Sequence, residues 1–245
     1  MGANIRWLQS PLVYTLNLVA GELKGIIFDV DGTMYRQFPV RTRMALRLLS
    51  HCSRKPAEGV ATFRLIRAYR RIQEELRDTG WSDDQLRLAC ERASIDPAWG
   101  ASCIATWIHE RPLDLVSESV YPDLLPFLER AGKEGLRLGV FSDYPAEKKL
   151  AALGIRRFFS YVVDASDQRV RQFKPAPRGI LTALDGLHLE ARHALYIGDR
   201  PSVDGEAARR AGVRCIIIGS SQARSGSGWS GVPDYATLGR VLGLA

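Results

Sequence analysis

Cysteine is scarce in this sequence and its residues are not clustered. The four cysteines in 245 residues are Cys52, Cys90, Cys103 and Cys215. No pair has the Cys-x-x-Cys spacing, so neither a zinc site nor a redox pair is indicated. Free thiols in a reducing compartment are the default for such a chain, and we therefore expect a cytoplasmic protein.

The sequence also lacks an uninterrupted apolar run long enough to span a bilayer. Residues 7–21 carry no charge and follow Arg6, a pattern that partly resembles a signal peptide. Polar residues and proline interrupt the run, at Gln9, Ser10, Pro11 and Asn17, and leave it too short and too polar to cross a membrane. We expect residues 1–23 to form an N-terminal arm packed on the protein; a peripheral membrane contact is the alternative.

No zinc finger, RNA-recognition motif or basic tail accompanies the positive charge. The formal net charge is +7 and the isoelectric point about 9.4. The densest basic cluster is Arg64, Arg67, Arg70 and Arg71, which would define one face of a helix. Such a face can meet nucleic acid or an anionic membrane. We expect a solvated face, and no nucleic-acid partner.

The apolar pattern divides the chain into two kinds of segment. Helical periodicity runs from about residue 42 to residue 116, whereas short apolar strands alternate with helices from residue 121 onward. Strands are predicted at 26–28, 136–141, 161–163, 194–197 and 213–218. Such alternation is typical of an α/β fold, here a doubly wound parallel sheet interrupted after its first strand by a helical insertion. The predicted parts are an arm at 1–23, an α/β core at 24–36 and 117–245, and a helical insertion at 37–116.

Capping and turn residues delimit several predicted elements. A short helix is expected near residues 42–49 and a longer one over 58–79. Ser82 followed by Gln85 predicts a capping box, and Asp96-Pro97 predicts another helix start. A further helix is predicted over 204–211, and Asp204 could cap it. Residues 219–231, rich in serine and glycine, predict a flexible surface loop.

Ionisable and hydroxyl residues follow the predicted strands where each strand ends. Asp29, Asp31 and Thr33 follow the first, and the others are Ser142, Asp143, Lys174, Asp199 and Asp204. Each has an ordinary structural explanation, such as a turn, a helix cap or a surface lysine. Because parallel strands end at one edge of a sheet, all of these residues are expected to face one crevice.

This set of residues suits metal-assisted phosphoryl transfer. Asp29 and Asp199 can hold Mg²⁺, which prefers oxygen ligands. One carboxylate can attack phosphorus and form an aspartyl-phosphate, while Mg²⁺, Lys174 and the groups at Ser142 neutralise the phosphoryl oxygens. A second carboxylate would protonate the leaving alcohol and then activate water.

Four motifs resemble those of the haloacid dehalogenase-like superfamily, in the same order, over residues 24–244. They are Asp29-Val-Asp-Gly-Thr33, Ser142, Lys174-Pro175 and Gly198-Asp199-x-x-x-x-Asp204. The resemblance implies that Asp29 is the nucleophile and a metal ligand. It implies that Asp31 is the general acid/base, with a backbone carbonyl that also reaches the metal. Dehalogenases of the superfamily lack an acid at that position, so Asp31 favours phosphate chemistry.

The resemblance also assigns the remaining roles. Ser142 would bind phosphate, and Lys174 would steady both Asp29 and the phosphate. Asp199 would ligate Mg²⁺, and Asp204 would hold or orient the metal site. Thr33 and Asp143 are expected to contact the substrate, Asp143 through its backbone N–H. The insertion resembles a type C1 cap, as in phosphoglycolate phosphatase-like members, and caps of this kind close over the site.

Two local departures from the superfamily pattern bear on the substrate. Tyr35 follows the first motif and would narrow the mouth of the site. Asp143, directly after Ser142, places a negative charge near the phosphate. Substrate contacts from the insertion, if its polar residues make any, would come from His51, Arg54, Lys55, His109 and Arg111; otherwise these are surface residues.

The favoured function is a Mg²⁺-dependent phosphatase acting on a small phosphomonoester metabolite. Two alternatives stay open: a phosphomutase on the same scaffold, and a non-catalytic binding or scaffold protein that keeps the fold.

Overall fold

The computed structural model describes residues 22–80, 82–220 and 228–244. Apart from residues 22 and 23, the predicted N-terminal arm lies outside the described residues, as does Trp81. Within them, no helix is long and apolar enough to cross a membrane. The four cysteines are free.

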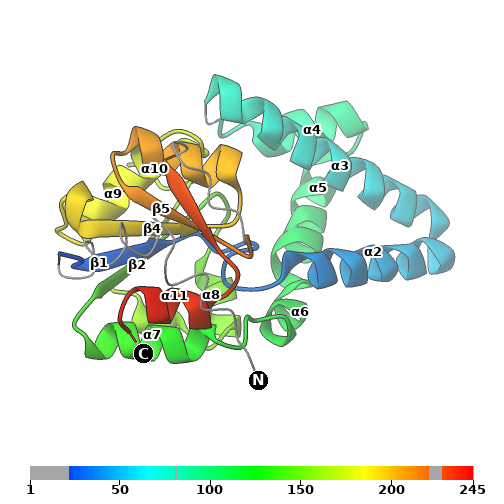
Figure 1. Cartoon of the computed structure of the whole chain (residues 1–245). Helices are drawn as coiled ribbons and strands as arrows, with labels where there is room; N and C mark the ends of the chain where they lie inside the picture. The colour runs from blue at the N-terminus through cyan, green and yellow to red at the C-terminus, as the bar shows by residue number, and fades with distance from the viewer. Residues whose placement is uncertain (1–21, 81, 221–227, 245) are drawn as a thin grey trace.

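The predicted parallel sheet forms the centre of the molecule, with six strands where five were predicted (Figure 1). The strand order is β3-β2-β1-β4-β5-β6. The strands are β1 (Gly25–Phe28), β2 (Arg137–Ser142), β3 (Tyr161–Asp164), β4 (Ala194–Gly198), β5 (Arg214–Ile218) and β6 (Trp229–Val232). The first strand lies in the middle and pairs with β2 and β4, so its carboxyl end opens at the centre of the sheet edge.

Alternate side chains of β1 pack on opposite faces of the sheet, because successive residues of a strand point to opposite sides. Ile26 and Phe28 join a core that includes residues of α7 (Leu124–Lys133), α8 (Glu147–Ala152) and α11 (Tyr235–Val241). Ile27 joins the opposite core, with α9 (Arg178–Gly186) and α10 (Glu206–Arg210). Both faces are therefore covered, which explains why the strands read as continuous apolar runs.

The segment between β1 and α7 is helical and supplies most of a third apolar core, which Ala165 and Phe173 of the α/β part complete. Its helices are α2 (Gln37–Arg54), α3 (Pro56–Thr79), α4 (Gln85–Ala93), α5 (Pro97–Ile104), the π-helix η2 (Ala105–Glu110) and α6 (Leu113–Glu118). We call these helices the cap. In Figure 1, α2 to α5 lie beside the sheet, beyond the carboxyl end of β1. The predicted boundary after residue 116 falls inside α6.

Several local predictions need correction. The helix expected near 42–49 spans Gln37–Arg54. No capping box forms at Ser82: its hydroxyl accepts from the Asp84 N–H, while the Gln85 side chain donates to the Tyr69 carbonyl. Asp96 does cap its helix, by accepting from the Trp99 N–H.

The segment predicted as a loop at 219–231 also differs. Its last residues begin β6, which pairs in parallel with β5 from Cys215 opposite Trp229. Residues 221–227 lie outside the described part. A short strand rich in serine and glycine has little propensity of its own, so the exposed edge of β5 decides its conformation.

Candidate active site

Asp29 lies directly after β1 and is held from both sides. Its side chain is buried, its Oδ1 is 2.5 Å from Lys174 Nζ, and its Oδ2 accepts a 2.9 Å hydrogen bond from the Thr33 hydroxyl. Burial raises the pKa of Asp29 to about 6. The charges of Asp204 and Asp31 act in the same direction, and the charge of Lys174 acts against them. The carboxylate is thus oriented, but its negative charge is only partly compensated.

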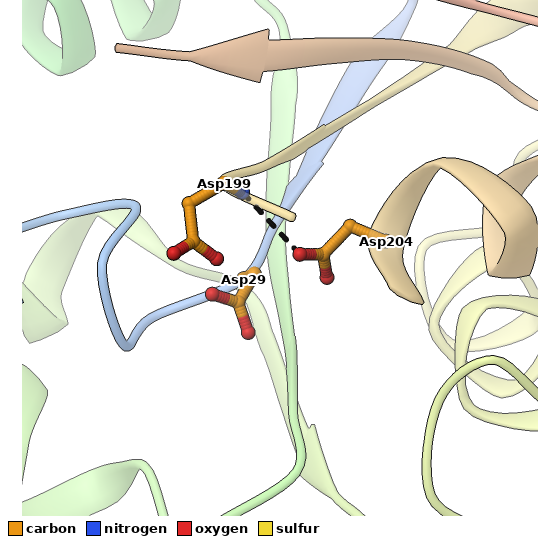
Figure 2. Close-up of side chains that lie close together, drawn as sticks. All are labelled: Asp29, Asp199 and Asp204. Atoms are coloured by element: carbon orange, nitrogen blue, oxygen red, sulfur yellow. Dashed lines mark hydrogen bonds between the residues drawn. The ribbon is translucent and has the colours of Figure 1, made fainter. Parts of the chain in front are cut away.

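Asp29, Asp199 and Asp204 form a carboxylate cluster at this sheet edge (Figure 2). Each offers an oxygen, and these oxygens lie within 4.8 Å of one another. Asp204 is fully buried and occupied: Oδ1 accepts from Lys174 Nζ at 2.7 Å, and Oδ2 from the backbone N–H of Arg200 at 2.9 Å. These bonds run to groups outside α10, so Asp204 does not cap that helix.

Asp199 is the open member of the cluster. Its Oδ1 is buried and has no hydrogen-bond partner among the described residues, and Arg200 Nε lies 3.9 Å from it. Burial, together with the charges of Asp29 and Asp204, raises its pKa to about 8. A buried carboxylate oxygen without a partner is costly unless a cation meets it. The carboxylate oxygens therefore fit Mg²⁺, with Asp199 and Asp29 as the residues that would hold it.

Lys174 joins the cluster from the loop before α9. It is fully buried, contacts Asp29 and Asp204, and lies 3.1 Å from the Tyr196 hydroxyl. Burial alone would lower its pKa, but the charges of Asp204 and Asp29 outweigh burial and hold it well above its usual value. Lys174 is therefore a fixed positive charge beside Asp29.

The Asp31 carboxylate has a different environment. Lys149 Nζ contacts both of its oxygens, at 2.5 and 2.7 Å, and the Tyr35 hydroxyl donates to it. Burial opposes ionisation of Asp31, but Lys149 and Tyr35 together outweigh burial and lower its pKa. Asp31 and Asp29 line the same cavity, although the Asp31 side chain is not among the three clustered carboxylates.

Ser142 is the last residue of β2, Asp143 follows it, and both approach the same region. The Ser142 hydroxyl is buried and accepts from the Tyr144 N–H at 3.2 Å. Asp143 accepts from the Lys174 N–H at 3.0 Å and pairs with Arg77 of α3 at 2.7 Å. Arg200 lies 3.4 Å from the same carboxylate. The Asp143 carboxylate, which we expected to lie beside the substrate phosphate, is thus paired with two arginines.

Several of these contacts had no signal in the sequence. Lys149 follows Lys148 in an ordinary helix, and nothing local distinguishes the two. Arg77 belongs to a helix of the cap rich in arginine, and the apolar run around Tyr196 predicts only a strand. The candidate cap residues His51, Arg54, Lys55, His109 and Arg111 do not line the cavity. Arg111 stacks instead on Trp107, 4.0 Å from the ring centroid.

Comparison with known proteins agrees with this geometry. The family model described as haloacid dehalogenase-like hydrolase matches residues 23–212. A phosphoglycolate phosphatase of Rhodospirillum rubrum is 29% identical over 237 residues, 90% of this chain and 91% of that protein. A glyceraldehyde 3-phosphate phosphatase of Methanopyrus kandleri is 28% identical, over 87% of this chain and 92% of that protein.

The fold has solved counterparts as well. The crystal structure of a 2-haloacid dehalogenase from Pseudomonas syringae pv. Tomato superposes with a TM-score of 0.65 at 23% identity. The match covers 90% of this chain and 98% of that one. At this identity the likeness concerns the fold, so the chemistry has to be argued from the site.

Proposed function

The chain belongs to the haloacid dehalogenase-like hydrolase family, and we propose that it is a Mg²⁺-dependent phosphatase of small phosphomonoesters that works through an aspartyl-phosphate. The observation that carries the proposal is the Asp29 carboxylate held by Lys174 at 2.5 Å and by Thr33 at 2.9 Å, beside an Asp199 oxygen with no partner. The phosphatase names of the two relatives above support the same reaction class.

Asp31 favours phosphate esters over halides as substrates. A leaving halide needs no proton, whereas a leaving alkoxide does. Asp31 lines the same cavity as Asp29 and is the acid available for that proton. A dehalogenase would have no use for this carboxylate.

The reaction divides into two transfers. A carboxylate oxygen of Asp29 attacks phosphorus, the ester P–O bond breaks, and Asp31 gives its proton to the leaving oxygen. Asp31 then takes a proton from water, whose oxygen attacks the phosphoryl group and releases phosphate from Asp29. Lys174 and the N–H groups after Ser142 neutralise the phosphoryl oxygens. Mg²⁺ held by Asp29 and Asp199 would add positive charge at these oxygens.

Lys149 and Tyr35 lower the pKa of Asp31 and keep it ionised. Asp31 therefore has to lose its contact with Lys149 and take up a proton from solvent before it can give one to the leaving oxygen. In the structure both Asp31 oxygens contact Lys149 Nζ. A bound phosphate dianion offers the ammonium a competing partner in the same cavity, which Lys149 also lines. Substrate binding thus removes a contact that keeps Asp31 ionised, so that Asp31 can take up a proton from solvent and act as the acid.

Hydrolysis of p-nitrophenyl phosphate tests the proposal, with Mg²⁺ and with a chelator. We expect metal-dependent turnover in the wild type and none in Asp29→Asn. Asp31→Asn should retain slow turnover, because p-nitrophenolate leaves with little need of a proton. Its rate should still be about 10²- to 10⁴-fold below the wild type, because the attacking water has lost its general base. The exposed Asp185 of α9 supplies the matched control, Asp185→Asn, which should behave as the wild type.

Other outcomes would redirect the assignment. Turnover retained by Asp29→Asn would exclude Asp29 as nucleophile. An inactive wild type that still binds Mg²⁺ and orthovanadate would favour the mutase. A wild type with neither turnover nor metal binding would favour the scaffold.

A further inference from the structure

The cavity between the cap and the sheet edge is lined by charged side chains on the core side and by many apolar side chains on the cap side. Its volume is about 360 Å³. Asp29, Asp31 and Lys149 line it on the core side. The cap contributes apolar side chains, namely Val40, Met44, Leu48, Phe63, Ile66 and Ile108. An apolar wall of this extent suits a leaving group with an apolar body, because apolar atoms bind where they displace water from apolar surface.

Two arginines of the cap line this cavity and form no hydrogen bond or ion pair with the described residues. Arg41 of α2 and Arg70 of α3 both line the cavity, and neither has a hydrogen bond or ion pair with a described residue. Neighbouring arginines on the same helices are paired: Arg47 with Asp114, and Arg77 with Asp143. Glu74, one turn after Arg70, is bonded to Arg77 instead.

The position of Arg70 on α3 shows how far it lies from the reacting end. Arg77 contacts Asp143 and the Lys174 carbonyl, so it marks the phosphate end of α3. Arg70 precedes it by two turns, about 10 Å along the helix axis. A two-carbon phosphorylated acid is too short to place its carboxylate that far from its phosphate.

We infer, on the basis of the proposed function, that the substrate is a phosphomonoester with a second anionic group and an apolar body between that group and the phosphate. Arg70 and Arg41 bind the second anion, and the apolar wall contacts the body. The guanidinium groups suit a carboxylate or phosphate because they bind planar or tetrahedral oxyanions with several donors. This places the substrate outside the class of short phosphorylated acids.

Four esters distinguish the features of this substrate. In 4-carboxyphenyl phosphate an apolar ring separates the two anions, whereas 2-carboxyphenyl phosphate holds them close together. The uncharged 4-methylphenyl phosphate has the same ring, and phosphoglycolate lacks an apolar body. We expect kcat/KM to be highest for 4-carboxyphenyl phosphate.

The arginine variants test which residues recognise the second anion. Arg70→Gln and Arg41→Gln should each raise KM for 4-carboxyphenyl phosphate about tenfold, the effect of one charge-assisted hydrogen bond. For 4-methylphenyl phosphate, which has no second anion, the same variants should lower kcat/KM far less. Arg67→Gln is the matched control, because Arg67 belongs to the same helix but lines a separate surface groove with Arg64 and Arg71.

Each outcome has one meaning for the substrate inference. A preference for phosphoglycolate, equal rates for the 4-carboxy and 4-methyl esters, or identical behaviour of Arg70→Gln and Arg67→Gln would overturn it while the phosphatase assignment stands. If no ester is hydrolysed, calorimetry with 4-carboxyphenyl phosphate still tests it. Binding that weakens in Arg70→Gln but not in Arg67→Gln supports the inference even though the proposed reaction has failed.

Discussion

At the scale of single residues, Gly32 keeps the carboxylate cluster in place. Its φ is +95°, and a Cβ built on it would lie 2.2 Å from Asp199 Oδ2. We expect Gly32→Ala to displace the Asp199 carboxylate and to lower kcat/KM about 10²-fold, the usual effect of a misplacement near 1 Å. Steady-state kinetics with p-nitrophenyl phosphate measures this change.

Gly80 is the matched control for Gly32, because alanine there would strain the backbone without a steric clash against a neighbouring side chain. Its φ is +98°, yet a Cβ there would meet nothing within 4 Å. Both alanine variants should lose about 1–3 kcal/mol of unfolding free energy, because L residues rarely adopt this region. Only Gly32→Ala should lose activity and the rise in melting temperature that bound Mg²⁺ produces. Equal activity of the two variants would contradict this role of Gly32.

At the scale of elements, the contact between α2 and α3 depends on Gly59. A Cβ on Gly59 would lie 2.5 Å from the Cys52 Cα, which is backbone and cannot rotate away. Gly59→Ala should therefore lower the unfolding free energy by about 1–3 kcal/mol, as overpacking usually does. Chemical denaturation is the measurement.

The matched control is Gly132 of α7, where a Cβ would meet nothing within 4 Å. Here alanine only restricts the unfolded chain and improves helix propensity, so Gly132→Ala should raise the unfolding free energy by about 0.4–1 kcal/mol. If both variants shifted stability in the same direction, the close approach of α2 and α3 would not be the cause.

At the scale of the whole molecule, Arg77 links the cap to the core. Its side chain is 7% exposed, that of Asp143 is 3% exposed, and the two lie 2.7 Å apart. A double-mutant cycle with Arg77→Gln and Asp143→Asn, measured as unfolding free energy by chemical denaturation, tests this contact. We expect a coupling free energy of up to about 3 kcal/mol, because either single change leaves a buried charge with one partner fewer.

The Arg43–Glu118 pair tests whether burial produces that coupling. Its side chains are 51% and 60% exposed, and water and salt screen such pairs. A cycle with Arg43→Gln and Glu118→Gln should give a coupling of about 0–1 kcal/mol. Additive effects at Arg77 and Asp143 would show that the cap is not held to the core through this contact.

What the sequence determined by itself rests on local pattern. Apolar runs alternating with helices predict a parallel sheet, and parallel strands end at one edge. Asp29, Lys174, Asp199 and Asp204 could therefore be expected together, and the structure does bring them together. The helical insertion followed from periodicity in the same way.

What only the tertiary structure decided depends on side chains from distant segments. Lys149 meets Asp31 and Arg77 meets Asp143 across the fold, and no local pattern encodes such a pairing. The predicted capping box at Ser82 does not form because the Gln85 side chain bonds to α3 instead. Strand β6 forms because β5 has an unpaired edge for it to pair with. Backbone periodicity is a local property, whereas the partner of a charged side chain is decided by how the elements pack.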